Sequence, residues 1–256
     1  MITQYWIKLW LSSFLIGDTM NDELFSTFYK KLDKEYYEFD KKLKNIIMNE
    51  ILDIELMVKY CFCNNFINRY SDNVDELFNQ KNYSNNNMVN DILERLKKQL
   101  EEYPPLEKSV YSYIKNISFG LIRDLLFISK PNDKDHICKK LTNEKISSND
   151  LDTILEFLVK TRNICCHHEL LYSFINNDIQ IPTTKYHKYF INDRIQHGKK
   201  DFLASLISIK LLVDKNTFSI LIDKIDELIN ESNISRNQLL YEMHLPSNYT
   251  KLKNQS

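Results

Sequence analysis

The chain has 256 residues, of which 43% are hydrophobic and 27% are charged, a balance that excludes a disordered protein. Its formal net charge of −1 does not favour a protein that binds duplex DNA over its whole surface, because such proteins are usually basic. Three glycines and five prolines are few for the tight turns of a β-sandwich or a Rossmann-type fold, so the composition favours long helices. We therefore predict an all-α protein. No repeat of fixed period and no long linker interrupts it, which predicts a single helical domain over residues 1–256.

The first segment of the chain, residues 5–17, is apolar but contains Lys8. It lacks the basic start and the small-residue cleavage site of a secretory signal, and it is shorter than the ~20 residues that span a bilayer. We expect a buried or interface helix here and no membrane association. The chain has five cysteines, and Cys165 and Cys166 are adjacent, which does not suit a disulfide framework. A reducing compartment and a cytoplasmic location are therefore expected.

Apolar residues recur at helical spacing after this segment, which predicts one long helix, or two in series, over residues 21–70. Residues 71–87 are polar and rich in asparagine, so we expect a loop, and a charged helix is predicted over residues 88–102. Because proline is tolerated in the first turn of a helix, the proline pair at 104–105 is expected to open the next helix, which runs to about residue 128.

A short helix is expected over residues 133–141. Ser147, followed three residues later by Asp150, forms a capping-box pattern before an apolar run and predicts that a helix begins there. We expect this helix to continue to about Phe174. Residues 176–198 show no clear period. The helices expected in the rest of the chain lie near residues 200–213, 215–230 and 235–243.

The helix predicted from residue 150 onward carries one charged residue in its apolar stripe. On a helical wheel, Arg162 falls in the middle of that stripe, and Asn163 and His167, four residues apart, share a face at its edge. A buried guanidinium is costly unless it is paired or faces a polar cleft. Arg162 is therefore either a structural residue paired with a carboxylate such as Glu55 or Asp124, or part of a functional cleft. The stripe consists of Leu151, Leu155, Leu158, Val159, Cys166 and Leu170.

Residues 162–167 read RNICCH, an R-N-x3-H string that resembles the signature of HEPN ribonuclease domains. The longer string TRNICCHHEL, residues 161–170, resembles the Abi-type abortive-infection family (AbiD/AbiF-like), which is similar to the HEPN domains of Cas13-type RNA-guided nucleases. Residues 1–20 lack the Tyr/Arg-rich motif of the family and are divergent. Other segments resemble the family in the same order between residues 25 and 250; they are residues 37–43 with Ile51, Ile54 and Glu55, then residues 104–106, 118–120 and 199–202.

The resemblance implies an HEPN-type helical bundle with additional helices, and a metal-independent endoribonuclease that acts as a toxin or anti-phage effector. In such an enzyme the 2′-OH of the RNA attacks the adjacent phosphate. The resemblance implies that His167 transfers the proton, that Arg162 stabilises the charge on the phosphorane and that Asn163 orients either group, with His168 as a second candidate for proton transfer.

The resemblance also implies partners for this chain. They are an RNA substrate and a small non-coding RNA that serves as antitoxin or guide. A homodimer is implied as well, because one helix holds Arg162 and His167 about 140° apart and two such helices are needed to complete one site.

Cys165, Cys166, His167 and His168 have the residue types of a zinc site but not its spacing. Structural zinc sites use spaced pairs, and adjacent residues on a helix point in different directions. No phosphate-binding glycine loop is present in the sequence. We therefore expect neither a metal nor a cofactor.

Residues 185–201 combine positive charge with aromatic side chains. Five Lys or Arg residues stand against two aspartates, and this composition suits the binding of single-stranded RNA. The alternative is an ordinary solvated loop, and the composition does not decide between the two. The candidate RNA-binding residues are Lys185, Tyr186, Lys188, Arg194, Lys199 and Lys200.

Two other functions fit the same sequence. An RNA-binding module would bind a small RNA without turnover, and Arg162 would grip phosphate only. A structural or partner-binding protein would instead use Arg162 in a core ion pair, where the loss of one partner costs roughly 3–5 kcal/mol. Turnover on RNA tests the first alternative, and thermal melting of an Arg162 variant tests the second.

Overall fold

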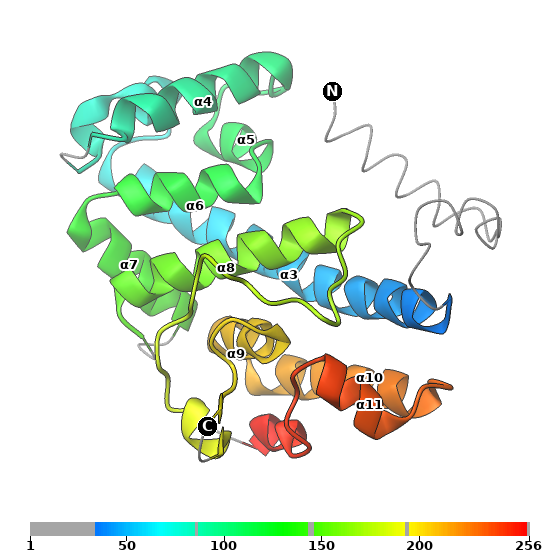
Figure 1. Ribbon diagram of the computed structural model, residues 1–256. Coiled ribbons are helices and arrows are strands. Elements are labelled where there is room, and N and C mark those ends of the chain that lie inside the picture. The colour runs from blue at the N-terminus through cyan, green and yellow to red at the C-terminus, as the bar shows by residue number, and fades with distance from the viewer. Residues whose placement is uncertain (1–33, 85–86, 143–145, 193–194, 255–256) are drawn as a thin grey trace.

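The long helix α3, Lys34–Arg69, runs through the whole molecule (Figure 1). It contains 36 residues and is roughly 54 Å long at 1.5 Å per residue. Its inner face carries the fully buried Leu43, Ile47 and Ile51 at helical spacing. The helix predicted over residues 21–70 is confirmed from Lys34 onward, and its first part lies outside the described residues. The computed structural model describes residues 34–84, 87–142, 146–192 and 195–254.

The predicted loop after α3 contains two short 3₁₀ helices, Val74–Phe78 and Gln80–Asn82. Asn73 precedes the first and Asn79 the second, and each side chain accepts a hydrogen bond from the backbone N–H two residues later. Asparagine at these positions therefore satisfies amide groups that a short helix leaves unpaired. The charged helix predicted next is confirmed as α4, Val89–Glu102.

The prediction that the prolines at 104–105 open a helix is wrong, since the chain is not helical there. A proline disfavours the helical conformation of the residue before it, so the second proline keeps the first out of a helix. Helix α5, Val110–Lys115, begins only after Ser109, and α6, Phe119–Ile128, begins after Ser118. Each serine hydroxyl accepts a hydrogen bond from the backbone N–H three residues later, which divides the predicted single helix into two.

Helix α7, Pro131–Thr142, covers the short helix predicted in this region, and here a proline does occupy the first turn. Helix α8, Ser148–Cys166, begins where the capping-box pattern predicts. The hydroxyl of Ser147 accepts a hydrogen bond from the backbone N–H of Asp150 at 3.1 Å.

The predicted continuation of α8 to Phe174 is wrong. The helix ends at Cys166, and His167 has an extended backbone with φ −115° and ψ −178°. Further on, the backbone N–H groups of Leu171 and Tyr172 both donate to the buried carboxylate of Asp40 on α3, each at 2.8 Å. These bonds to a distant helix satisfy amides that a longer α8 would have bonded to its own carbonyls.

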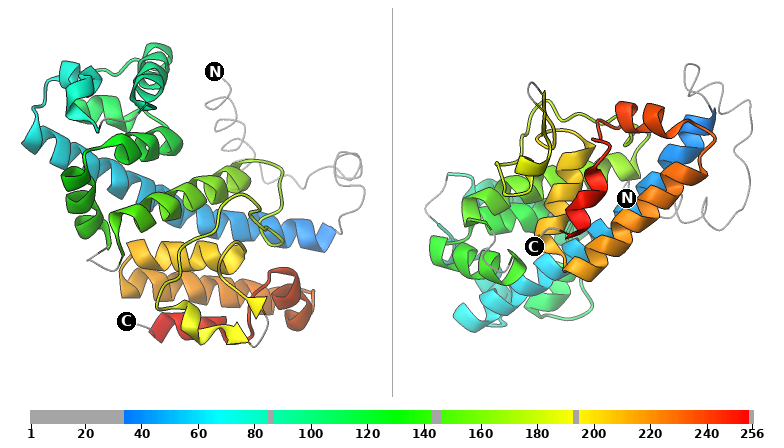
Figure 2. Two further views of the ribbon diagram at one scale, coloured as in Figure 1. Left: turned by 60° about the vertical axis from the view of Figure 1, so that its left-hand side comes forward. Right: turned by 90° about the horizontal axis from the view of Figure 1, so that it is seen from below.

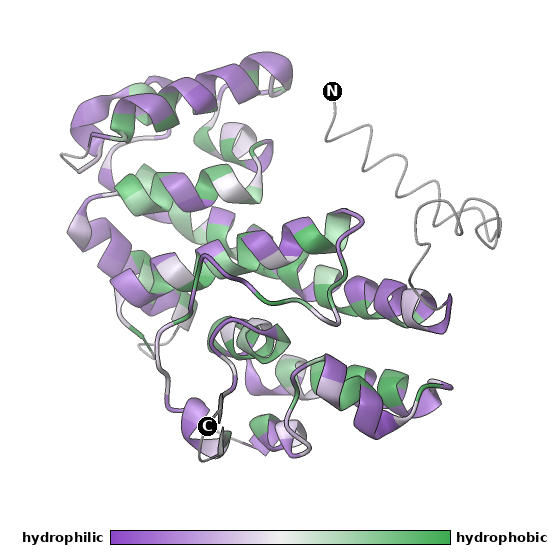
Figure 3. Ribbon diagram, viewed as in Figure 1, coloured by the Kyte–Doolittle hydropathy of each residue, from purple (hydrophilic) through white to green (hydrophobic). Residues whose placement is uncertain are grey.

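Helix α9, Phe202–Leu212, is buried along its whole length. It packs against α3, α8 and α10, Lys215–Glu231. Figures 1 and 2 show α9 between α8 and α10. In Figure 3 apolar colours predominate on α9, whereas α4 is mostly hydrophilic. A hydrophobic cluster that extends along the chain from Phe39 to Leu252 includes α9, so this helix is the centre of the core.

The helices predicted near residues 200–213, 215–230 and 235–243 are confirmed as α9, α10 and α11. Because the strands have only two residues each, the all-α class is confirmed. None of the helices in the described ranges is long and apolar enough to cross a bilayer. The remaining elements are α11 (Arg236–Glu242), the 3₁₀ helices η3 (His187–Tyr189) and η4 (Tyr249–Asn254), and the antiparallel strands β1 (Ile191–Asn192) and β2 (Ile195–Gln196).

Candidate functional site

Arg162, near the end of α8, is half-buried. Its Nε atom is buried and has no hydrogen-bond partner among the described residues, and its Nη1 atom lies 3.5 Å from Oδ1 of Asn163. The two carboxylates named as its structural partners are bound to other cations: Glu55 pairs with Lys59 at 2.7 Å, and Asp124 pairs with two other arginines. Within the described part of the chain, Arg162 therefore does not form the core ion pair that the structural alternative requires.

Arg162 faces a groove with a volume of about 960 Å³. Its walls come from α3, α4, the end of α5 with the turn that follows it, α6 and α8. Charged and polar side chains stand beside apolar ones in this lining, so the groove can accept a ligand that carries charge. Besides Arg162, the charged residues that line it are Glu55, Arg95, Lys98, Glu102 and Lys115.

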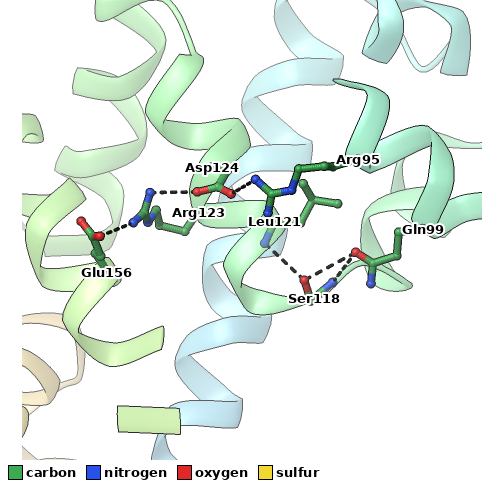
Figure 4. A network of polar contacts seen from close by, with 7 residues as sticks. All are labelled: Arg95, Gln99, Ser118, Leu121, Arg123, Asp124 and Glu156. Atoms are coloured by element: carbon green, nitrogen blue, oxygen red, sulfur yellow. Dashed lines mark hydrogen bonds and ion pairs between the residues drawn. The ribbon is translucent and has the colours of Figure 1, made fainter. Parts of the chain in front are cut away.

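Ion pairs join three of the helices that form this groove (Figure 4). Asp124 on α6 pairs with Arg95 on α4 and with its neighbour Arg123, each at 2.8 Å. Arg123 also pairs with Glu156 on α8 at 2.9 Å. The network fixes α4 against α6 and α6 against α8, and it thereby sets the shape of the groove that Arg162 enters.

The candidate histidines do not lie on the helix that carries Arg162. Because α8 ends at Cys166, the prediction that Asn163 and His167 share a helical face is wrong, and the separation of about 140° around one axis does not apply. Asn163 is exposed on α8, and His167 and His168 are exposed on the turn that follows. Neither histidine lines the groove, so in one chain the described residues bring Arg162 to it and leave both histidines outside.

The turn that carries the histidines is attached to α3 by Asp40 and Lys44. Asp40 is only 2% exposed and pairs with Lys44 at 3.0 Å. The ammonium of Lys44 also donates to the backbone carbonyl of His167 at 3.2 Å. Asp40 also accepts hydrogen bonds from the backbone N–H groups of Leu171 and Tyr172, so both ends of the turn are fixed to α3.

Burial raises the pKa of the Asp40 carboxyl above its ordinary value, and the charge of Lys44 and the donated backbone N–H groups offset part of this shift. The sequence alone does not predict that Asp40 holds the turn that carries the histidines. A signal is nevertheless present, because Asp40 stands three and seven residues before Leu43 and Ile47 and so falls within the buried stripe of α3. A carboxylate at such a position requires a buried partner.

The cysteines beside the histidines are unsuited to nucleophilic chemistry. Burial raises the pKa of both Cys165 and Cys166, which keeps the thiols protonated. All five cysteines are free, and Cys61 and Cys63 are buried in the core. In the ranges that the structure describes, no three or more His, Cys, Asp or Glu side chains gather as they would around a metal ion.

The loop expected to bind RNA lies against α9 and does not reach the groove. Lys185, Lys188 and Lys200 are exposed, but none of them lines the groove beside Arg162. In Figure 1 the yellow segment that contains η3 lies at the lower left, whereas α8 ends to the right of the centre. Arg194 lies outside the described residues.

Two of the other candidates in this loop have structural contacts. Tyr186 is 1% exposed, and its ring packs beneath the ammonium of Lys210, so the expectation that it stacks on a base is corrected. Lys199 is half-buried and donates to the carbonyl of Ile181 at 3.1 Å and to the hydroxyl of Thr183 at 2.6 Å. Its ammonium thus holds the two sides of the loop together.

The chain belongs to the Abi-like protein family, which matches residues 2–173. The matched part includes α3 to α8, Asp40 and the string from Arg162 to His168, and it also includes the N-terminal segment predicted to be divergent. This membership implies a role in abortive-infection phage defence. No curated protein and no solved structure matches the chain.

Proposed function

We propose that this protein is an HEPN-type endoribonuclease of the AbiD/AbiF-like kind, and that it acts in the cytoplasm as a toxin or anti-phage effector. One observation carries the proposal: the guanidinium of Arg162 has a buried nitrogen without a partner among the described residues and faces a groove lined by charged side chains. A phosphate in the groove supplies the bidentate acceptor that this guanidinium lacks. The R-N-x3-H string, the all-α fold and the family membership support the same reading.

The proposed reaction uses the 2′-OH of the RNA as the nucleophile. The 2′-oxygen forms a bond to the adjacent phosphorus, the bond from phosphorus to the 5′-oxygen breaks, and the products are a 2′,3′-cyclic phosphate and a free 5′-OH. His167 accepts the proton of the 2′-OH or protonates the 5′-oxygen, and Arg162 stabilises the negative charge on the phosphorane. Asn163 orients one of these groups, and no metal ion enters any step.

The proposal includes a homodimer, because one chain does not bring its histidines to the groove that Arg162 faces. An exposed apolar patch lies beside that groove on α3 and the segment before α5. Leu56 and Tyr60 are 65% and 59% exposed, and Leu52 and Leu106 line both the patch and the groove. A second copy seated on this patch buries apolar surface and adds its own histidine turn at the rim of the groove.

Incubation of the purified protein with a mixed-sequence RNA tests the enzymatic proposal. Cleavage is expected in the presence of EDTA, with 2′,3′-cyclic phosphate or 3′-phosphate ends, and Arg162→Ala and His167→Ala should both abolish it. A requirement for Mg²⁺ or Mn²⁺, or 3′-OH products, contradicts the mechanism. Cleavage that survives His167→Ala and stops with His168→Ala transfers the proton-transfer role to His168.

An RNA-binding module without turnover is the second candidate. The observation in its favour is the same separation of histidines and groove, since an arginine that lines the groove can pair with a phosphate without a histidine. In that case a small non-coding RNA occupies the groove as antitoxin or guide. Binding that is weakened by Arg162→Ala but indifferent to His167→Ala, with no cleavage by the wild-type protein, identifies this function.

A further inference from the structure

The groove beside Arg162 has positive charge that is not neutralised by its neighbours. Of its lining cations, Arg95 is paired with Asp124, whereas Lys98 and Lys115 are exposed and form no ion pair within the described ranges. Of its lining carboxylates, Glu55 is bound by Lys59, which is not among the residues that line this groove. Three of the lining cations, including Arg162, therefore form no ion pair in the part of the chain that the structure describes.

The two free lysines stand on different walls of the groove. Lys98 is on α4, and Lys115 is the last residue of α5. Tyr103, which follows α4, also lines the groove and offers an aromatic ring there. Cations on different walls, an aromatic ring and a guanidinium are the features with which proteins bind a single nucleic acid strand, because the cations meet phosphates and the ring stacks on a base.

We propose that this groove is the path by which a single-stranded RNA segment reaches Arg162, with Lys98 and Lys115 bound to phosphates and Tyr103 stacked on a base. The inference deepens the proposed function and rests on it. It places the RNA strand on α4, α5 and α8 rather than on the loop at residues 185–200, whose side chains do not line the groove.

The test measures binding separately from cleavage. A fluorescent 2′-O-methyl RNA of twelve nucleotides lacks the attacking hydroxyl, so its binding to the purified protein is followed by anisotropy at several salt concentrations. The variant Lys98→Glu with Lys115→Glu is compared with Lys185→Glu with Lys188→Glu, which makes the same change of charge at two exposed lysines of the loop. Circular dichroism checks that both variants remain helical.

The groove variant is expected to weaken binding at least 10-fold and to reduce the slope of log Kd against log salt by about 1.4, since each phosphate contact to a single strand contributes about 0.7. The loop variant is expected to bind like the wild type. Tyr103→Ala should weaken binding about 5-fold or more, and Tyr103→Phe, which retains the ring, should restore it. A blunt duplex of the same sequence should bind less tightly than the single strand.

A wild-type affinity in the groove variant overturns the inference, as does a loss confined to the loop variant. The absence of binding by the wild-type protein also overturns it. Cleavage of unmodified RNA is measured in parallel, so that the two proposals fail separately. Normal cleavage by the groove variant leaves the ribonuclease in place without this path, whereas binding through the groove without any cleavage retains the path and removes the ribonuclease.

Discussion

Replacement of Asp40 by alanine should destabilise the protein by about 3–5 kcal/mol. The carboxylate is buried, accepts two backbone N–H groups at 2.8 Å and pairs with Lys44 at 3.0 Å. A buried donor that loses its acceptor costs about 1–3 kcal/mol, and two such donors are left together with an unpaired ammonium. Asp40→Asn should cost far less, because an amide oxygen still accepts the two N–H groups.

Urea denaturation followed by circular dichroism measures both values. Asp178→Ala serves as the control, because its pair with Lys160 is at the surface and such pairs contribute under about 1 kcal/mol. If Asp40→Ala costs no more than this control, the turn after α8 has other acceptors and Asp40 does not hold it.

The dependence on pH gives an independent check of the same residue. Because the folded protein raises the pKa of Asp40 above its ordinary value of 3.8, the native carboxyl binds a proton more readily than the unfolded one. The stability that this tighter proton binding contributes is therefore full below pH 3.8, and it falls as the pH rises through the raised pKa of the folded protein. Asp40→Asn does not titrate and should lack this fall. If the free energy of unfolding depends on pH with the same slope in the wild type and in Asp40→Asn between pH 3.8 and 7, the assignment is contradicted.

Four further predictions concern the site. Arg162→Ala should change the free energy of unfolding by less than about 1 kcal/mol, because no carboxylate among the described residues loses its partner; a loss of about 3–5 kcal/mol would restore the structural alternative. Expression of the wild type should be toxic in a host that lacks the antitoxin, and both Arg162→Ala and His167→Ala should abolish toxicity at unchanged protein levels. Sedimentation at micromolar concentration should give about twice the chain mass of 30.7 kDa. Leu56→Glu should convert this dimer to a monomer, whereas the control Ile220→Glu, at another exposed apolar residue, should not. A mixed dimer of one wild-type chain and one Arg162→Ala, His167→Ala chain should be nearly inactive, and full activity per wild-type chain would exclude a composite site.

The start of α8 and its end differ in how far they can be predicted from the sequence. The start depends on Ser147 and Asp150, which are three residues apart, so a local pattern is sufficient. The end depends on Asp40, more than 120 residues earlier in the chain, whose carboxylate binds the backbone of Leu171 and Tyr172. Helical periodicity contains no information about such a partner, and the apolar residues after Cys166 continue the pattern although the helix has stopped.

The role of Arg162 is undecided in the sequence for a similar reason. Its position in an apolar stripe is visible there, but the availability of Asp124 depends on whether other arginines bind it first. That is decided by the packing of α4 and α8 against α6, which brings Arg95 and Arg123 to the carboxylate. Tyr186 gives the opposite case, because its place among lysines favours an exposed ring, and only the packing against α9 shows that it is buried.

The burial of α9 has a consequence for synthesis of the protein. The family match ends at residue 173, yet α3 and α8 complete their apolar faces against a helix that begins at Phe202. A nascent chain that already includes Arg162 and both histidines therefore still lacks the centre of its core. The ribosome must release residues up to about 212 before these helices can pack, so the site at Arg162 is incomplete for most of translation. A chain stalled at residue 173 should accordingly be digested by a protease that leaves the finished protein intact.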